Sequence, residues 1–267
     1  MSLITQKNKI HNIKRILKIT NSSNMVDVVN NRSIINLFNQ MNIFTAYTYI
    51  TCLCVYCRDN NLLDLHSFWL SELIKQKQII DTYYENKVYN INITLNDIIN
   101  KFNELSLIQR DINLEMMYLL LALLIHLKPK RCELAEICLI NNNKNYIENN
   151  KLIMNNFKTS KFYGKIIEQL NDDIMLIINK SLKDYPRDYL LINSKGKPFT
   201  HNCYSRFFKT TFKKLFDRDV TVNNWRKYYT LSIDYNNIKY KDLKDVAKNM
   251  GHSIETHMTY YKLPHHL

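Results

Sequence analysis

The stretch Met250–Leu263, "MGHSIETHMTYYKL", lies near the end of the sequence and holds one of the chain's three glycines. Gly251 follows the helical pattern of "YKDLKDVAKNM" and directly precedes His252, which is typical of a glycine that ends a helix. Tyr260 and Tyr261 come shortly afterwards. The stretch predicts either a helix–turn–helix edge with packing tyrosines or a site that combines a histidine with a tyrosine nucleophile.

The composition favours long helices and a polyanionic partner. The 267 residues are 46% hydrophobic, and they include only 3 glycines and 4 prolines. So few turn-forming residues argue against a strand-dense sandwich or barrel. The formal net charge is +13. Lysines and arginines that pair with phosphates release counterions, so nucleic acid is the leading candidate partner, and an anionic membrane surface is the rival.

Membrane, disulfide and metal functions find little support. The apolar run "MMYLLLALLIHL" is shorter than the roughly 20 residues that span a bilayer, so it predicts a buried helix, and the first residues lack the apolar core of a secretory signal. The six cysteines show no disulfide spacing, which favours a reducing compartment. Cys52, Cys54 and Cys57 do not share a helix face, so we expect buried structural thiols. His257, His265 and His266 lack a partner set for a metal.

Two domains are expected, residues 1–92 and residues 93–267. Helical patterns dominate the first domain, including "FTAYTYITCLCVYCRDN" and "LHSFWLSELIKQKQIIDTYYENK", which predicts one helix or a helix pair. In the second, Asn96 or Asp97 is expected to cap a helix. Residues 141–170 alternate asparagine clusters with short apolar runs, and predict a small antiparallel sheet with a turn at Gly164. Residues 172–182, 201–216, 223–235 and 240–250 predict further helices.

Three cationic side chains and a histidine precede the tyrosines in separate local contexts. Arg131 is expected to open a helix, Lys158 lies in "NFKTSKFYGK", and Arg226 lies in "NNWRKYY". Two arginines can grip two oxygens of one phosphate, and a lysine can protonate a leaving oxygen. With His252 and a nucleophilic tyrosine, such a set could stabilise a pentacoordinate phosphorane without metal. Lys161 is the alternative to Lys158.

These motifs, in this order, resemble the catalytic domain of tyrosine recombinases, the phage-integrase family, which shares its chemistry with type IB topoisomerases. The segments that carry the resemblance are "RCELAEICL", "FKTSK", "WRKYYTLSI" and "MGHSIETHMTYY", within residues 100–263. The first domain is similar to the family's helical core-binding domain. The resemblance implies a mainly α fold with a small antiparallel β-sheet, arranged as a C-shaped DNA clamp. It also implies a 3′-phosphotyrosine intermediate with a free 5′-hydroxyl, and no ATP, metal or other cofactor.

The family pattern is not followed everywhere. Many recombinases carry a histidine three residues before the second arginine, where this chain has Asn223, which can donate a hydrogen bond but cannot transfer a proton. Aligning "CEL" with the family places Lys130 at the first arginine position. We assign Arg131 instead, because lysine cannot make the bidentate contact. The family's tyrosine usually follows its histidine by nine positions, which favours Tyr261, with Tyr260 as the alternative.

Basic residues outside this set are candidate DNA contacts. In the N-terminal segment "KNKIHNIKRILKIT" these are Lys14, Arg15 and Lys18, although a solvated helix face explains them equally well. Within residues 201–216 they are Arg206, Lys209 and Lys213, which would track phosphates without reading sequence. We expect double-stranded DNA as the partner. We expect self-association as a tetramer on paired sites. A monomer is the alternative, because only "KLPHHL" follows Tyr261.

Three functions remain open at this point. The first is a site-specific recombinase or integrase, the second a DNA-relaxing enzyme like the type IB topoisomerases, and the third a non-catalytic protein that binds branched DNA junctions. An enzyme of this kind works intracellularly where the DNA is, in the nucleus or cytoplasm of a host or in a virion. The heavy use of Asn, Ile and Lys indicates an AT-rich genome, and a virus or mobile element would fit.

Overall fold

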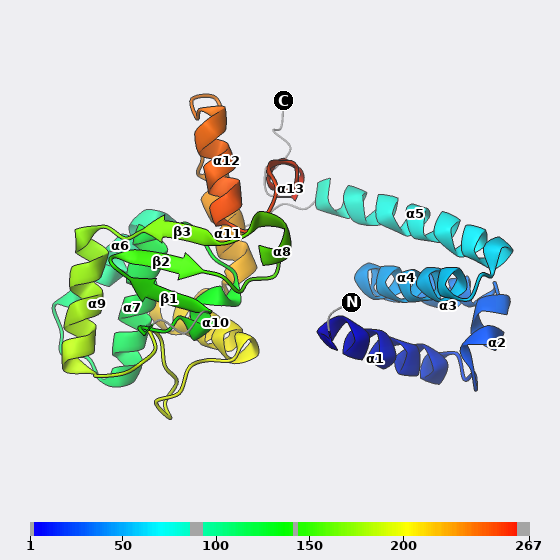
Figure 1. Cartoon of the computed structure of the whole chain (residues 1–267), viewed down its shortest axis with the longest axis horizontal. Coiled ribbons are helices and arrows are strands. Elements are labelled where there is room, and N and C mark those ends of the chain that lie inside the picture. The colour runs from blue at the N-terminus through cyan, green and yellow to red at the C-terminus, as the bar shows by residue number, and fades with distance from the viewer. Residues whose placement is uncertain (1–2, 86–92, 141–143, 261–267) are drawn as a thin grey trace. The chain divides into compact units, whose positions relative to one another are not determined.

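The computed structural model describes residues 3–85, 93–140 and 144–260 (Figure 1). Its internal contacts divide the chain into two compact units, Met1–Val88 and Tyr89–Leu267. The division falls a few residues before the expected boundary between residues 92 and 93, within the segment 86–92, which lies outside the described residues. Each unit encloses a hydrophobic core of its own.

The described part of the first unit is helical. Its helices are α1 (Leu3–Ile19), α2 (Met25–Asn30), α3 (Ile34–Asn39), α4 (Ile43–Asp59) and α5 (Leu63–Glu85). The stretch expected to form one helix or a pair is the single helix α5, whereas α2 has no counterpart in the sequence prediction. Trp69 anchors α5 in the core by donating its indole N–H to the carbonyl oxygen of Val29 at 3.1 Å.

The three neighbouring cysteines of α4 behave as expected of structural thiols. Cys54 and Cys57 are buried in the first core, and Cys52 is half-buried against it. Burial raises the pKa of Cys57 to about 11, so its thiol stays protonated and unreactive near neutral pH. Across the described residues no group of three His, Cys, Asp or Glu side chains is arranged to hold a metal ion.

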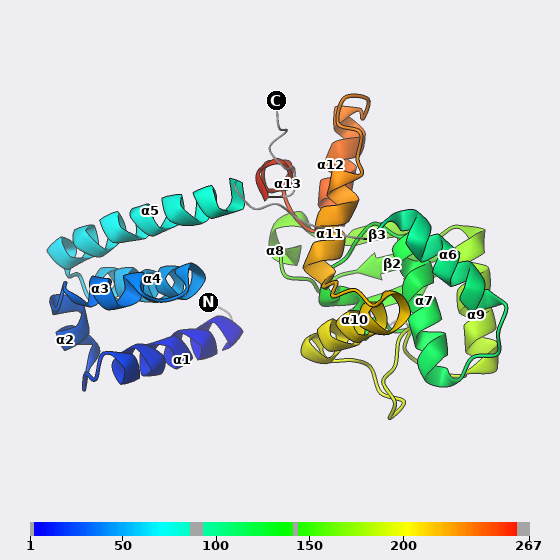
Figure 2. The same cartoon turned by 180° about the vertical axis from the view of Figure 1, so that it is seen from behind.

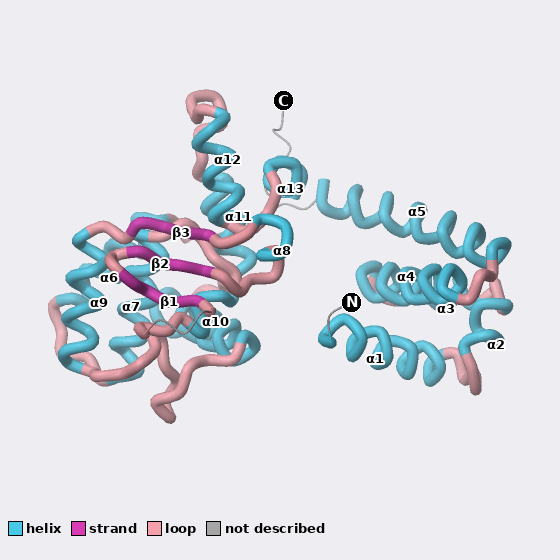
Figure 3. Tube along the Cα trace, in the orientation of Figure 1, coloured by secondary structure: helices cyan, strands magenta, loops and turns pink. Residues whose placement is uncertain are grey.

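In the second unit, helices lie behind and beside one small sheet, as seen from behind in Figure 2 and by element type in Figure 3. Strands β1 (Asn145–Glu148), β2 (Lys151–Met154) and β3 (Ile166–Gln169) pair antiparallel in the order β1-β2-β3. The helical elements are α6 (Leu95–Ser106), α7 (Ile112–His126), the 3-10 helix η1 (Cys132–Glu136), α8 (Ser160–Tyr163), α9 (Asp172–Asp184), α10 (His201–Phe216), α11 (Val222–Leu231), α12 (Tyr240–Asn249) and α13 (Ile254–Tyr260). The predicted mainly α fold with a small antiparallel sheet is confirmed.

The start of α6 differs from the prediction. The cap is Thr94, not Asn96 or Asp97. The Thr94 hydroxyl accepts the backbone N–H of Asp97 at 3.1 Å, and the Asp97 carboxylate accepts the backbone N–H of Thr94 at 2.7 Å. This reciprocal capping box satisfies two amides that the first helical turn leaves unpaired, and it lowers the pKa of Asp97. Asn96 and Asp97 therefore lie inside the first turn, because the reciprocal pair of Thr94 and Asp97 sets the start of the helix.

The apolar helix α7 forms the centre of the second core. Its residues from Met116 to Leu124 are buried, as the sequence predicted. Among the described residues, no helix is both long and apolar enough to cross a membrane.

Left-handed backbone conformations shape the turns of both units. All three glycines, Gly164, Gly196 and Gly251, have positive φ angles. Asparagine takes the same conformation elsewhere: Asn149 and Asn150 form the turn between β1 and β2, with φ angles of 51° and 57°. Two consecutive left-handed residues match the twist of an antiparallel hairpin, and asparagine is the residue after glycine that best tolerates them.

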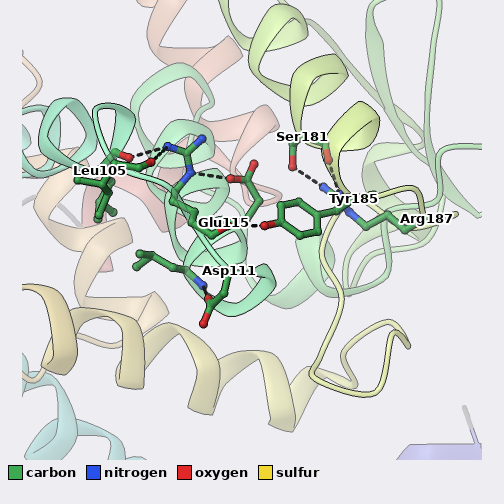
Figure 4. A network of polar contacts seen from close by, with 9 residues as sticks. Leu105, Asp111, Glu115, Ser181, Tyr185 and Arg187 are labelled. Atoms are coloured by element: carbon green, nitrogen blue, oxygen red, sulfur yellow. Dashed lines mark hydrogen bonds and ion pairs between the residues drawn. The ribbon is translucent and has the colours of Figure 1, made fainter.

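A buried ion pair joins the ends of α6, α7 and α9 (Figure 4). Arg110 donates from Nε to the carboxylate of Glu115 at 2.6 Å and from Nη1 to the carbonyl oxygen of Leu105 at 2.5 Å. The guanidinium also lies 4.0 Å from the ring centroid of Tyr118. The Tyr185 hydroxyl, just after α9, donates to the carbonyl oxygen of Arg110. This network closes the loop that leads into α7.

Removing the buried carboxylate should destabilise the second unit strongly. Glu115 is only 2% exposed, so Glu115→Ala leaves the Arg110 charge buried and unpaired, and we expect a loss of about 3–5 kcal/mol in the free energy of unfolding. Urea unfolding followed by the fluorescence of Trp225 in a Trp69→Phe background reports this unit alone.

The matched control removes an exposed carboxylate from the same region. Glu104 pairs with Lys101 on the surface of α6, and Glu104→Ala should cost less than about 1 kcal/mol. Equal losses in the two variants would contradict a structural role for the buried pair.

Candidate functional site

Arg226 lies inside the second unit with none of its surface exposed. It is carried by α11, which is capped by Thr221, whose hydroxyl accepts the backbone N–H of Asn224. Arg226 Nη1 donates to the carbonyl oxygen of Pro129 at 3.0 Å, and Nη2 donates to the carbonyl oxygen of Met250 at 2.8 Å. A buried cation needs such acceptors. By bonding these two carbonyl oxygens, Arg226 links the segment that follows α7 to the end of α12.

The same guanidinium contacts His252. Arg226 Nη2 lies 3.1 Å from His252 Nδ1. The end of α12 places this histidine. The backbone N–H of His252 donates to the carbonyl oxygen of Ala247 at 3.1 Å, and the backbone N–H of Gly251 donates to the carbonyl oxygen of Lys248 at 2.9 Å. These two bonds form a Schellman motif, which requires the positive φ of 72° found at Gly251. The predicted glycine stop is confirmed.

Lys158 is held beside this turn by its two neighbours. The Thr159 hydroxyl donates to the carbonyl oxygen of Gly251 at 2.7 Å, and Phe157 is buried with its ring against Gly251. Lys158 itself is exposed. Lys158 lies in the connection between the antiparallel strands β2 and β3, in the hairpin expected from the sequence, and this connection includes α8. Figure 1 shows α8, α11 and α12 gathered at one end of the sheet.

Lys130 and Arg131 occupy different environments. Lys130 is 5% exposed, and its ammonium bonds the carbonyl oxygen of Asn249 at 2.9 Å and the carboxylate of Glu168 at 2.5 Å. Burial lowers the pKa of Lys130, and Glu168 opposes this effect. Arg131 is half-buried at the start of η1 rather than of an α-helix. Lys130 is therefore engaged in packing β3 against α12, whereas Arg131 remains partly open to solvent.

The electrostatic field around His252 is positive. Burial is the largest cause that lowers the pKa of His252 to about 3, followed by Arg226, His257 and Arg131. Burial and then Arg226 lower the pKa of His257 to about 4. Both imidazoles are therefore neutral at physiological pH. Two arginines, one buried and one partly exposed, act on the same histidine, which makes this place suited to an anion.

The remaining members of the predicted site are only partly placed. Asn223 lies one helical turn before Arg226 on α11 and is exposed. Tyr260 is the last residue of α13, while the favoured nucleophile Tyr261 lies outside the described residues, as do His265 and His266. The structure brings Arg226, His252 and the backbone flanking Lys158 together, and it leaves the choice between the two tyrosines open.

The predicted phosphate-contacting residues are exposed on their helices. Lys14, Arg15 and Lys18 project from α1, and Arg206 projects from α10. On α10, Lys209 pairs with Asp219 at 3.0 Å and Lys213 pairs with Asp217 at 2.7 Å. Exposed pairs of this kind are weak, so a phosphate could replace either carboxylate at small cost.

Two side chains that the sequence analysis did not assign to the site contact it directly. His257 bonds His252, with His252 Nε2 and His257 Nδ1 3.0 Å apart, and the hydroxyl of Tyr235 lies 2.9 Å from His257 Nε2. The sequence "HSIETH" places His252 and His257 on either side of one helix start, and this spacing indicates that the two side chains could meet. Tyr235 precedes α12 and carried no local signal.

Comparison with known proteins gives the following similarities. No protein-family model matches the chain, and no curated protein matches it. Among solved structures it is similar to XerA recombinase, with 14% identity over 99% of this chain and 89% of that chain (TM-score 0.48). It is similar to a lambda integrase dimer bound to a COC′ core site, with 14% identity over 96% of each chain (TM-score 0.46).

A third similar structure is XerH site-specific recombinase bound to difH substrate, with 17% identity over 85% of this chain and 68% of that chain (TM-score 0.43). At these identities the chemistry has to be inferred from the side chains of this chain.

Because His252 and His257 are neutral in the folded protein, we expect its stability to fall with pH well above the pH range in which carboxylates titrate. Unfolded histidines titrate near pH 6.5, so between about pH 6.5 and 4 the unfolded state binds more protons than the folded state. The free energy of unfolding should therefore fall as the pH falls through this window, and the pKa values of about 3 and 4 set its lower end. Urea midpoints of the second unit measured between about pH 7.5 and 5 check this.

The double variant His252→Asn/His257→Asn carries neither titrating group and should show a shallower decline. An unchanged slope in that variant would mean that the acid sensitivity comes from other groups.

Proposed function

We propose that this protein is a tyrosine recombinase that cuts and rejoins DNA strands through a covalent 3′-phosphotyrosine, without ATP or metal. The observation that carries the proposal is the gathering of segments far apart in the sequence around one guanidinium. Arg226 bonds His252 at 3.1 Å, and Thr159, the residue after Lys158, bonds the glycine that precedes His252 at 2.7 Å. The charge of Arg131 also acts on His252.

The proposed cleavage step uses these residues in distinct roles. The hydroxyl of Tyr261 attacks the phosphorus, its proton passes to water, and the bond from phosphorus to the 5′-oxygen breaks. Lys158 gives a proton to the leaving 5′-oxygen. Arg131 and Arg226 stabilise the charge that develops on the other phosphate oxygens. Attack by a 5′-hydroxyl from another strand reverses these events and reforms the backbone without an external energy source.

The two units take separate tasks in this proposal. Residues 93–267 form the catalytic domain, and residues 1–92 form a helical core-binding domain that holds DNA. The net charge of +13 and the exposed cations of α1 and α10 support double-stranded DNA as the partner. Strand exchange requires two DNA sites, so we propose that the protein self-associates on paired sites. We also propose that it belongs to a virus or mobile element. It would work wherever its DNA is, inside a cell or virion.

A second candidate function is DNA binding without chemistry, for example at branched junctions. It is favoured by the environment of Lys130, which occupies the first arginine position by alignment and is already paired with Glu168 at 2.5 Å. Asn223 also replaces a residue that could transfer a proton. A DNA-relaxing enzyme like the type IB topoisomerases would use the same side chains as the recombinase, so only its products distinguish it.

Covalent trapping tests the proposal directly. Wild-type protein incubated with a library of nicked suicide duplexes, without ATP or magnesium, should give an SDS-stable protein–DNA adduct. Tyr261→Phe should abolish the adduct because the nucleophile is lost, whereas the matched variant Tyr260→Phe should retain it. The adduct is measured as a shifted band on denaturing gels.

Three results would redirect the proposal. Loss of the adduct only in Tyr260→Phe would move the nucleophile to Tyr260. Relaxation of supercoiled plasmid without strand exchange would favour the topoisomerase-like reaction. A shift of four-way junction DNA with no adduct on any substrate would favour binding without chemistry.

Substitutions at Lys130 and Arg131 should have different effects: one should lower the free energy of unfolding and the other should lower adduct formation. Lys130→Met leaves the Glu168 carboxylate unpaired in the interior and should lower the free energy of unfolding by about 3–5 kcal/mol. Arg131→Ala should change it by less than about 1 kcal/mol and reduce adduct formation by about 100-fold or more. The measurements are urea unfolding and the trapping assay. If Lys130→Met/Glu168→Leu restores stability and yet forms no adduct, Lys130 itself contacts the phosphate.

A further inference from the structure

A chain of hydrogen bonds leads away from Arg226 into the protein. Arg226 Nη2 lies 3.1 Å from His252 Nδ1, and His252 Nε2 lies 3.0 Å from His257 Nδ1. The next link joins His257 Nε2 and the hydroxyl of Tyr235, which lie 2.9 Å apart. His252 is 4% exposed and His257 is not exposed at all, so solvent does not compete for these bonds.

The chemistry of the first link fixes the direction of all the others. A guanidinium has only donors, so His252 Nδ1 must accept from Arg226 and carries no proton. In the neutral ring the proton then sits on Nε2, which donates to His257 Nδ1. By the same reasoning His257 carries its proton on Nε2 and donates to the Tyr235 oxygen. Each ring is held in a single tautomer, and every bond in the chain polarises the next.

This arrangement has a consequence for His252. Both of its ring nitrogens are engaged by protein groups, one by Arg226 and the other by His257. A histidine in this state is suited to orienting the guanidinium rather than to exchanging protons with a phosphate. The pKa values of about 3 and 4 agree, because both rings stay neutral and add no charge that would have to be balanced.

A neutral acceptor at position 257 has an electrostatic advantage over a carboxylate. Aspartate there would attract the Arg226 guanidinium and offset the positive field that a phosphate needs. Histidine instead passes a hydrogen bond along to Tyr235, which lies on a different segment, between α11 and α12. His257 and Tyr235 thus fix the geometry of His252 without neutralising the arginine.

We propose that His257 and Tyr235 are positioning residues that act through His252, holding it as the Nε2–H tautomer so that His252 Nδ1 orients the Arg226 guanidinium for phosphate. The proposal rests on the proposed function for its consequence in catalysis, and on the hydrogen-bond geometry for the tautomers. His252 then acts on the phosphate through Arg226 and not as its proton donor.

Paired substitutions at position 252 distinguish the two roles. The side-chain oxygen of asparagine falls where histidine has Nδ1, whereas the amide of glutamine reaches the place of Nε2. If His252 orients Arg226, His252→Asn should keep adduct formation within about tenfold of wild type, and His252→Gln should lose more than that. If His252 donates directly from Nε2, the order of the two variants reverses, which would overturn the proposal.

Position 257 provides the second pair. His257→Asn keeps an acceptor for His252 Nε2 and should retain adduct formation within about threefold, whereas His257→Leu removes it and should lose about tenfold or more. Urea unfolding checks that the variants fold. Equal activity of His257→Asn and His257→Leu, with both folded, would exclude a positioning role.

A readout independent of activity separates failure of this proposal from failure of the proposed function. Nitrogen NMR of histidine-labelled wild-type protein at neutral pH should show His252 and His257 each with an unprotonated Nδ1 and a protonated Nε2. A protonated Nδ1 on His252 would overturn the tautomer assignment whether or not the protein forms an adduct. Expected tautomers in a protein that forms no adduct would leave the hydrogen-bond chain standing and reject the recombinase reaction.

Discussion

The burial of one guanidinium constrains most of the second unit. Arg226 has no exposed surface, and a positive charge in that position is tolerated only when its donors meet acceptors. The carbonyl oxygens of Pro129 and Met250 supply two of these acceptors, and the ring of His252 supplies a third. The segment after α7, the end of α12 and the turn at Gly251 must therefore converge on α11. A candidate site arises as a consequence of satisfying one charge.

Local signals in the sequence were enough for much of this architecture. Residues 201–216 form α10 as predicted, because apolar residues recur at helical spacing between a threonine cap and a basic last turn. The helix stop at Gly251 and the sheet within residues 141–170 were equally readable. In each case the deciding residues lie within a few positions of one another. The helix α2 was missed because six residues are too few to show a period.

What the sequence left open depends on contacts between distant segments. The burial of Lys130 follows from Glu168 on β3 and from a carbonyl oxygen on α12, and neither is close to it in the chain. Tyr235 meets His257 across α12 in the same way. The order of the motifs indicated which residues would be gathered at the site. It gave no information about which charges would be paired inside the protein, and Lys130 and Arg131 differ in that respect.

The left-handed turns link the fold to the amino-acid composition of the chain. The chain holds only three glycines, and all of them have positive φ angles. Asn21, Asn61, Asn149 and Asn150 occupy four more. Glycine codons are rich in G and C, and asparagine codons are rich in A and T, so nucleotide drift toward A and T removes glycine and supplies asparagine. Because asparagine is the next residue able to adopt this conformation, such a drift can pass through the turns of a protein while its topology survives.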